Sequence, residues 1–169
     1  VLLQAQQSYQ SSVLPAKRGN IYDCNGNLLA TSQKVYTVIL DCKEVNDEKH
    51  DYVDATVKAL VDVLGIDEDD IRKKLTDPAT SSSQYQILKK QITMDQKKAF
   101  EEYASPGEDS GLSEKELEER ANVQGVWFEE DYLRIYPFDE LACDTIGFTL
   151  SRETADAGLE GYYNSTLMG

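Results

Sequence analysis

Cysteine and histidine are scarce in this sequence of 169 residues. Cys24, Cys42 and Cys143 contain no C-x-x-C pair, so their odd and wide spacing predicts neither a disulfide framework nor a zinc site. Three free thiols are the preferred interpretation. A Cys24–Cys42 pair is the alternative, because the two residues flank a predicted strand. The single histidine, His50, lies in an acidic segment, which indicates a surface position. We therefore expect neither a metal nor a cofactor.

Positive charge and long apolar runs are also lacking. Lys and Arg number 17 against 31 Asp and Glu, which gives a net charge of −14. Such a surface repels nucleic acid and anionic membranes, so we expect no nucleic-acid partner. No run of 18 apolar residues occurs, so no segment here should span a membrane. The sequence opens at Val1 without a signal peptide, and we expect it to be a piece of a longer protein.

What the sequence does contain is a mixture of strand and helix patterns without a β-α-β repeat, which predicts an α+β fold. A strand is expected over residues 34–41 and a largely helical subdomain over residues 47–121, with helices at 47–64 and from residue 66 to Asp77. Capping boxes begin at Thr93 and Ser113. Residues 125–128 and 132–136 read as two strands joined by an acidic turn, and residues 157–167 as a closing helix.

The stretch from Arg18 to Ala30 organises the rest of the chain. Pro15 keeps the chain before Arg18 extended, and Gly19, next to the charged Arg18, can adopt a wide range of backbone conformations. Asp23 opens a tight hairpin turn in which Asn25 and Gly26 should supply positive φ angles.

This stretch resembles the first motif of the non-catalytic N-terminal module of class B penicillin-binding proteins, R-G-x-I-x-D-R-x-G-x-x-L-A. Cys24 departs from it, where the family usually has Arg. Two later motifs follow in the family's order. R-x-Y-P matches Arg134, Tyr136 and Pro137, with Gly147 downstream. G-x-x-G-x-E matches Gly158 and Glu160, although its first glycine is Ala155 here. The matching residues of the first motif are Arg18, Gly19, Ile21, Asp23, Gly26, Leu29 and Ala30.

The resemblance implies that residues 15–169 form an elongated dimerisation, or pedestal, domain and residues 1–14 a stalk that follows a missing membrane anchor. It implies a position outside the cytoplasmic membrane of a bacterium. The module would hold a D,D-transpeptidase domain, absent here, and would contact proteins that polymerise glycan strands or direct division or elongation. A homodimer is also possible in the family.

This chain itself is not expected to be an enzyme. No serine is followed three residues later by lysine, and Lys-Thr-Gly does not occur, so the β-lactam-reactive signatures are missing. We expect no catalytic residue.

The charged motif residues suggest a structural role. We hypothesise that Arg18 or Arg134 pairs with Glu160 and pins the first hairpin to the last helix, because the Arg fork suits a carboxylate. The alternative is a set of solvated charges, each pair worth about 0–1 kcal/mol.

Two other function classes remain open. Glu129, Glu130, Asp131 and Asp139 near Trp127-Phe128 could serve a two-carboxylate glycosidase, although acids at strand connections are usually solvated. A free-standing module that senses wall fragments is the other alternative.

Overall fold

The computed structural model describes residues 17–47, 49–106, 111–139, 143–149, 154–155 and 157–168. The proposed stalk, Pro15 and part of the loop after residue 106 lie outside these ranges. The α+β expectation is confirmed, because antiparallel strands alternate irregularly with helices. The elements are β1 (Ile21–Tyr22), β2 (Leu28–Leu40), α1 (Cys42–Val45), α2 (Val53–Leu64), α3 (Glu68–Thr76), β3 (Gln86–Ile92), α4 (Met94–Ala104), α5 (Glu114–Ala121), β4 (Val126–Ile135), α6 (Cys143–Ile146), α7 (Gly158–Tyr162) and α8 (Asn164–Leu167).

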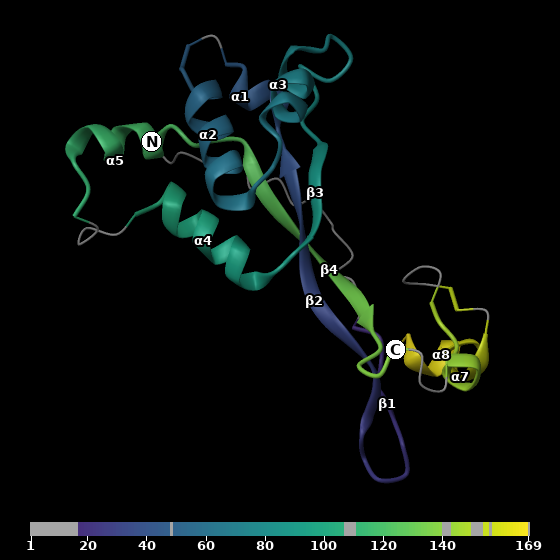
Figure 1. Ribbon diagram of the computed structural model, residues 1–169. Coiled ribbons are helices and arrows are strands. Elements are labelled where there is room, and N and C mark those ends of the chain that lie inside the picture. Colours follow the sequence, from purple (N-terminus) through teal and green to yellow (C-terminus); the bar gives the residue numbers. More distant parts are fainter. Residues whose placement is uncertain are drawn as a thin grey trace, which may run out of the picture.

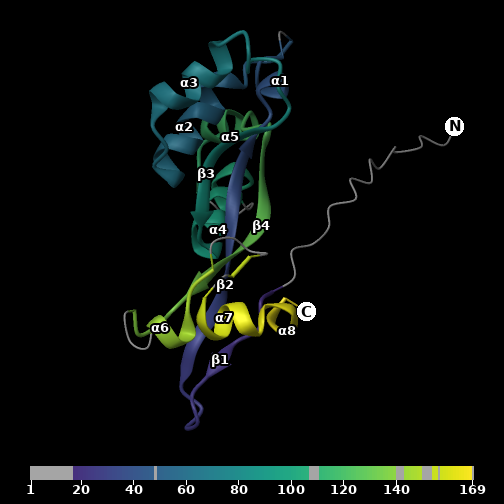
Figure 2. The ribbon, with the colours of Figure 1, turned by 90° about the vertical axis from the view of Figure 1, so that its right-hand side faces the viewer.

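Strand β2 is the axis of an elongated molecule (Figures 1 and 2). Its thirteen residues span about 40 Å at the rise of an extended strand. β4 pairs with β2 from Thr31 to Leu40, and β3 pairs on the opposite side from Tyr36 to Leu40. β1 pairs near Ala30, at the other end. We call the end that carries α1–α5 and β3 the head, and the end that carries β1 and α6–α8 the base.

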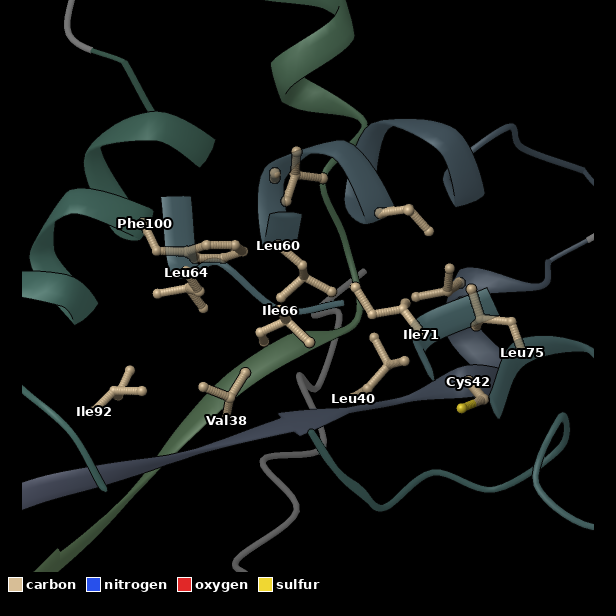
Figure 3. Packing of buried hydrophobic residues seen from close by; sticks show 14 of the residues in the cluster. Val38, Leu40, Cys42, Leu60, Leu64, Ile66, Ile71, Leu75, Ile92 and Phe100 are labelled. Carbon is tan, nitrogen blue, oxygen red and sulfur yellow. The ribbon is translucent and has the colours of Figure 1, made fainter. Parts of the chain in front are cut away.

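The head holds one apolar core on a single face of the sheet (Figure 3). Alternate β2 residues point to this face, and the apolar sides of α2 and α3 cover them. Phe100 of α4 closes the core. Its ring packs edge to face against the ring of Phe128, and the two ring centroids lie 5.5 Å apart. α5 buries no side chain, as its charged sequence predicts. The fully or nearly buried members are Tyr36, Val38, Leu40, Cys42, Val45, Val57, Ala59, Leu60, Leu64, Ile66, Ile71, Leu75, Ile92, Phe100 and Val123.

Local sequence signals set most of the helix ends. Both predicted capping boxes are present. The Thr93 and Ser113 side chains accept the N3 amides, and the backbone amides of Thr93 and Ser113 donate to the side chains of Gln96 and Glu116 in return. Asp67 caps α3 by accepting the amides of Asp69 and Asp70, and the acidic first turn of α3 lies at the positive end of the helix dipole. Gly65 ends α2 in the left-handed region at φ 60°.

The predicted pair of strands around Glu129–Asp131 is wrong, because β4 is one continuous strand through these acids. Three exposed polar residues in a row imitate a turn. They are compatible with a strand here because, among the described residues, β4 pairs on one side only and both its faces reach solvent at this point.

Several boundaries and one turn conformation also differ from the predictions. β2 begins at Leu28 and not at residue 34. α2 starts at Val53, because residues near Asp47 form turns in which the Asp47 side chain binds His50. The closing helix breaks at Tyr163 into α7 and α8. In the first hairpin only Gly26 has a positive φ, at 84°, and Asn25 does not.

Candidate functional site

Glu160 is the centre of the site. It lies in α7 with no exposed surface. Arg18 donates from Nε to its Oε2 at 2.7 Å, and Arg134 donates from Nε to its Oε1 at 2.7 Å. Tyr136 Oη donates to the same Oε1 at 3.4 Å. We call these four residues, Arg18, Arg134, Tyr136 and Glu160, the motif cluster. The predicted ion pair is present, and both arginines take part instead of one.

Sheet register brings Arg134 to this place. Arg134 pairs with Ser32 across β2 and β4, and its Nη1 donates to the Gly19 carbonyl at 2.7 Å and to Ser32 Oγ at 3.2 Å. Ser32 Oγ in turn donates to the Arg18 carbonyl at 3.1 Å. Arg134 Nη2 lies 2.7 Å from Glu160 Oε1 at an angle that gives an ion pair but no hydrogen bond. Arg134 is therefore held from three segments of the chain.

Arg18 ties the start of the described chain to its last two helices. Its Nη2 donates to the Glu160 carbonyl at 3.0 Å and its Nη1 to Asn164 Oδ1 at 2.7 Å. The next amide, that of Gly19, donates to the Leu167 carbonyl at 2.7 Å. A Cβ at Gly19 would lie 3.2 Å from Leu167 Cδ2, so a small residue allows this approach.

Tyr136 and Pro137 follow β4 and lead the chain out of the sheet. Tyr136 Oη accepts the Thr149 amide at 3.2 Å, while Pro137 begins a turn that ends at Asp139. The phenol thus links the segment after α6 to the carboxylate of Glu160.

The backbone crosses itself at the base, where the two motif glycines, Gly147 and Gly158, lie against each other. A Cβ on Gly147 would lie 1.9 Å from the Ala157 carbonyl oxygen, and one on Gly158 would lie 2.5 Å from the Gly147 nitrogen. Both have positive φ, at 76° and 60°. No other residue allows the backbones after α6 and before α7 to touch in this conformation.

Asp23 and Gly26 lie apart from the motif cluster, at the tip of the β1–β2 hairpin. Asp23 Oδ1 accepts the amides of Asn25 and Asn27, each at 2.8 Å, and its Oδ2 accepts Asn27 Nδ2 at 2.7 Å. These bonds, led by the Asn27 side chain, hold the pKa of Asp23 below its usual value. Asp23 therefore shapes the turn and does not bind the arginines.

Two members of the arrangement escaped the sequence analysis. Ser32 links Arg18 and Arg134, and Asn164 binds Arg18. Asn164 follows Glu160 by four residues, a spacing that puts both on one face of the single closing helix that the sequence predicts and could have suggested it. Ser32 could be found only from the β2–β4 register.

The cysteines and the histidine give no reactive centre. Cys24, Cys42 and Cys143 are all free thiols, so Cys24 and Cys42 do not pair. Burial raises the pKa of the Cys42 thiol, which favours its unreactive form. His50 is exposed and binds Asp47, as expected of a surface histidine.

No metal-binding group of three or more His, Cys, Asp or Glu residues occurs within the ranges that the structure covers. Over the same ranges, no helix is both long enough and apolar enough to cross a membrane.

The carboxylates proposed for a glycosidase do not converge on a cleft. Glu129, Glu130 and Asp131 follow one another along the exposed part of β4. Glu130 binds Lys34 at 2.7 Å, and Glu129 accepts the Tyr85 hydroxyl at 2.7 Å. Asp139 lies in the turn beyond Pro137. This geometry gives no observation in favour of two-acid hydrolysis.

The assembled motifs match those of a known family. A family model of the penicillin-binding protein dimerisation domain matches residues 13–169, so the chain belongs to that family.

Two curated relatives are similar to most of this chain. The chain is 30% identical over 154 residues to stage V sporulation protein D of Bacillus subtilis (strain 168), covering 90% of this chain and 20% of that protein. It is 28% identical over 166 residues to penicillin-binding protein 3 of the same organism, covering 97% and 22%. The chain thus spans about a fifth of the length of these curated relatives.

Solved structures agree on the fold. A peptidoglycan synthetase from Bifidobacterium adolescentis ATCC 15703 superposes with a TM-score of 0.55 at 25% identity, over 92% of this chain and 29% of that one. Penicillin-binding protein 2X from Streptococcus thermophilus superposes with a TM-score of 0.61 at 22% identity, over 92% and 23%, and shows the same fold.

Proposed function

We propose that this module is a non-catalytic part of a peptidoglycan D,D-transpeptidase and that it positions the transpeptidase domain for cell-wall synthesis. The observation that carries the proposal is the motif cluster. It joins the first described segment, at Arg18, to α7 at Glu160, and Arg18 also binds Asn164 of α8. The names of the relatives, among them a penicillin-binding protein and a peptidoglycan synthetase, support the assignment to wall synthesis.

The positions of the entry and exit give the proposal its geometry. Gly19 bonds to Leu167, so both ends of the described chain lie side by side at the base (Figure 2). The head lies at the far end of β2 and β4. We infer that the base fixes a following transpeptidase domain relative to a preceding membrane stalk. The head is left free for protein contacts.

The partners of this role are the module's own transpeptidase domain and membrane proteins that polymerise glycan strands or direct division or elongation. A second copy of the chain is a further candidate. The location that fits is the outer face of the bacterial cell membrane, reached through an anchor that precedes the stalk.

The test uses the full-length parent protein in cells that lack their own copy. Glu160→Gln breaks the motif cluster, and Glu118→Gln, at an exposed position of α5, is the matched control. We measure labelling by a fluorescent penicillin and incorporation of a fluorescent D-amino acid into the wall. We expect Glu160→Gln to keep penicillin labelling, which shows a folded transpeptidase domain, and to lose incorporation. Wild-type incorporation by both Glu160→Gln and a deletion of residues 15–169 would overturn the proposal.

Binding experiments with the isolated chain distinguish the proposed role from an enzyme or a wall-fragment sensor. It should take up no fluorescent penicillin and show no saturable binding of muropeptides. Saturable muropeptide binding would instead support a module that senses wall fragments.

A further inference from the structure

The outer edge of β4 is open in the part of the chain that the structure describes. β2 occupies one side of β4, and no described strand pairs with the other. The Gly125 carbonyl accepts the Asp41 amide on the β2 side, so the alternate residues Val126, Phe128 and Glu130 direct their backbone groups outward. Such an edge is a template for a further strand.

An apolar cleft runs beside the first half of this edge. It lies between α4 and β4 and has a volume of about 370 Å³. The β4 residues that line it are only partly buried. A strand added to β4 would place alternate side chains over this cleft. Its apolar lining consists of Phe100, Ala104, Val123, Val126, Trp127 and Phe128.

The second half of the edge is acidic. Glu129, Glu130 and Asp131 are consecutive and exposed. Lys34 neutralises only Glu130, and Tyr85 donates a neutral hydroxyl to Glu129. Glu129 and Asp131 point to the sheet face opposite α4, since side chains alternate along a strand. The edge therefore offers apolar contact at one end and uncompensated negative charge at the other.

A second copy of the chain does not fit this edge. The two antiparallel two-fold registers that pair the most residues are centred on Glu130 and on Asp131. The first places Glu129 opposite Asp131 of the other copy, and the second places Asp131 opposite its own counterpart. Like charges directly opposite each other destabilise a strand pair. Each copy also carries a net charge of −14.

We propose that residues 126–131 of β4 bind an extended, basic segment of another protein by antiparallel strand addition. Read from its N-terminus, the partner segment has the pattern Lys-x-Lys-Φ-x-Φ, where Φ is a bulky apolar residue and Arg can replace Lys. The two cations face Asp131 and Glu129, and the two apolar side chains enter the α4–β4 cleft beside Phe128 and Val126. Main-chain bonds to the outward groups of β4 supply the remaining affinity. This inference does not depend on the positioning role proposed above.

The test measures fluorescence anisotropy of the full 169-residue chain with a labelled peptide containing Lys-Thr-Lys-Leu-Thr-Leu. The matched peptide Glu-Thr-Glu-Leu-Thr-Leu should not bind. N-methylation of the peptide amides that face β4 should abolish binding, while N-methylation on the opposite edge should leave it unchanged. Equal binding of the two N-methylated peptides, or no saturable binding of the basic peptide, would overturn the proposal.

Protein variants locate the site. Glu129→Gln, Glu130→Gln and Asp131→Asn together should weaken binding about three- to tenfold, the size expected for two exposed ion pairs. Asp62→Asn, Glu114→Gln and Glu118→Gln together change the net charge equally at exposed positions elsewhere and should leave binding unchanged. Equal effects of the two triple variants would refute a site on β4.

One further pair of variants separates the contribution of the backbone amide from that of the side-chain charge. Glu130→Pro removes an outward amide at an edge position where proline is tolerated, whereas Glu130→Ala removes the same charge and keeps the amide. Only the proline variant should lose most of the binding. A homodimer in sedimentation that Glu130→Pro dissolves would assign the edge to a second copy and reject the proposed partner.

Discussion

Glu160→Gln should destabilise the module severely. The substitution keeps the volume of the side chain, so no cavity forms, and its effect comes from charge. Glu160 is fully buried, and the Arg18 and Arg134 side chains are only 5% and 6% exposed. Without the carboxylate, two buried guanidinium groups lose their anion. Removing one partner of a buried ion pair costs about 3–5 kcal/mol, against a total stability of about 5–15 kcal/mol for a typical domain.

Urea unfolding of the isolated chain measures this loss. At a urea dependence of about 2 kcal/mol/M, a loss of 3–5 kcal/mol lowers the midpoint by about 2 M. Circular dichroism follows the whole chain. Fluorescence of Trp127, the single tryptophan, follows the head, because Trp127 pairs with Ile39 in the upper part of the sheet. If the base opens first, the circular dichroism transition should precede the fluorescence transition.

A control identifies the source of the effect. Glu118→Gln removes an exposed carboxylate of α5 and should leave the free energy of unfolding within about 0.5 kcal/mol of wild type. A Glu160→Gln midpoint equal to that of the control would show that the motif cluster does not stabilise the base, and the reasoning would be refuted.

Three further outcomes are expected. Gly147→Ala should lower the free energy of unfolding in urea by more than about 2 kcal/mol, because its Cβ would meet backbone 1.9 Å away. Gly26→Ala, with open space around its Cβ, should lower it by about 1 kcal/mol. Equal losses would contradict the backbone crossing. Phe100→Ala should cost about 3–5 kcal/mol, since it empties the core beside Phe128, and a cost below 1 kcal/mol would show that α4 does not close the core. Carbon-detected NMR should show the pKa of Asp23 below that of an ordinary aspartate. Because this pKa is lowered in the folded state, the contribution of Asp23 to stability is present above the unfolded pKa and is lost as pH falls through the folded pKa. Asp23→Asn should remove this pH dependence of stability at acid pH, and an unchanged dependence would contradict the role of its hydrogen bonds.

Local signals were sufficient wherever a few neighbouring residues decide the structure. The capping boxes at Thr93 and Ser113 and the left-handed Gly65 are such cases. Each involves bonds between residues no more than five positions apart, so the sequence alone carries the information.

The motif cluster was predicted only in part, because its contacts join residues that are far apart in the sequence. The charges of Arg18, Arg134 and Glu160 suggested an ion pair with one of the two arginines. That Arg134 reaches Glu160 together with Arg18 depends on which residue of β2 faces Arg134. That register joins Ser32 to a residue about one hundred positions later, and no local pattern fixes it. The same limit explains β4, whose acids imitate a turn until its pairing with β2 is known.

The neighbouring positions of Gly19 and Leu167 determine how the module would carry tension. A pull between the segments before and after it would load the Gly19–Leu167 bond and the Arg18–Glu160 pair first. The head lies outside this load path, at the far end of β2. Mechanical force along the chain would therefore be borne by a few bonds at the base, while the surfaces of the head kept their shape.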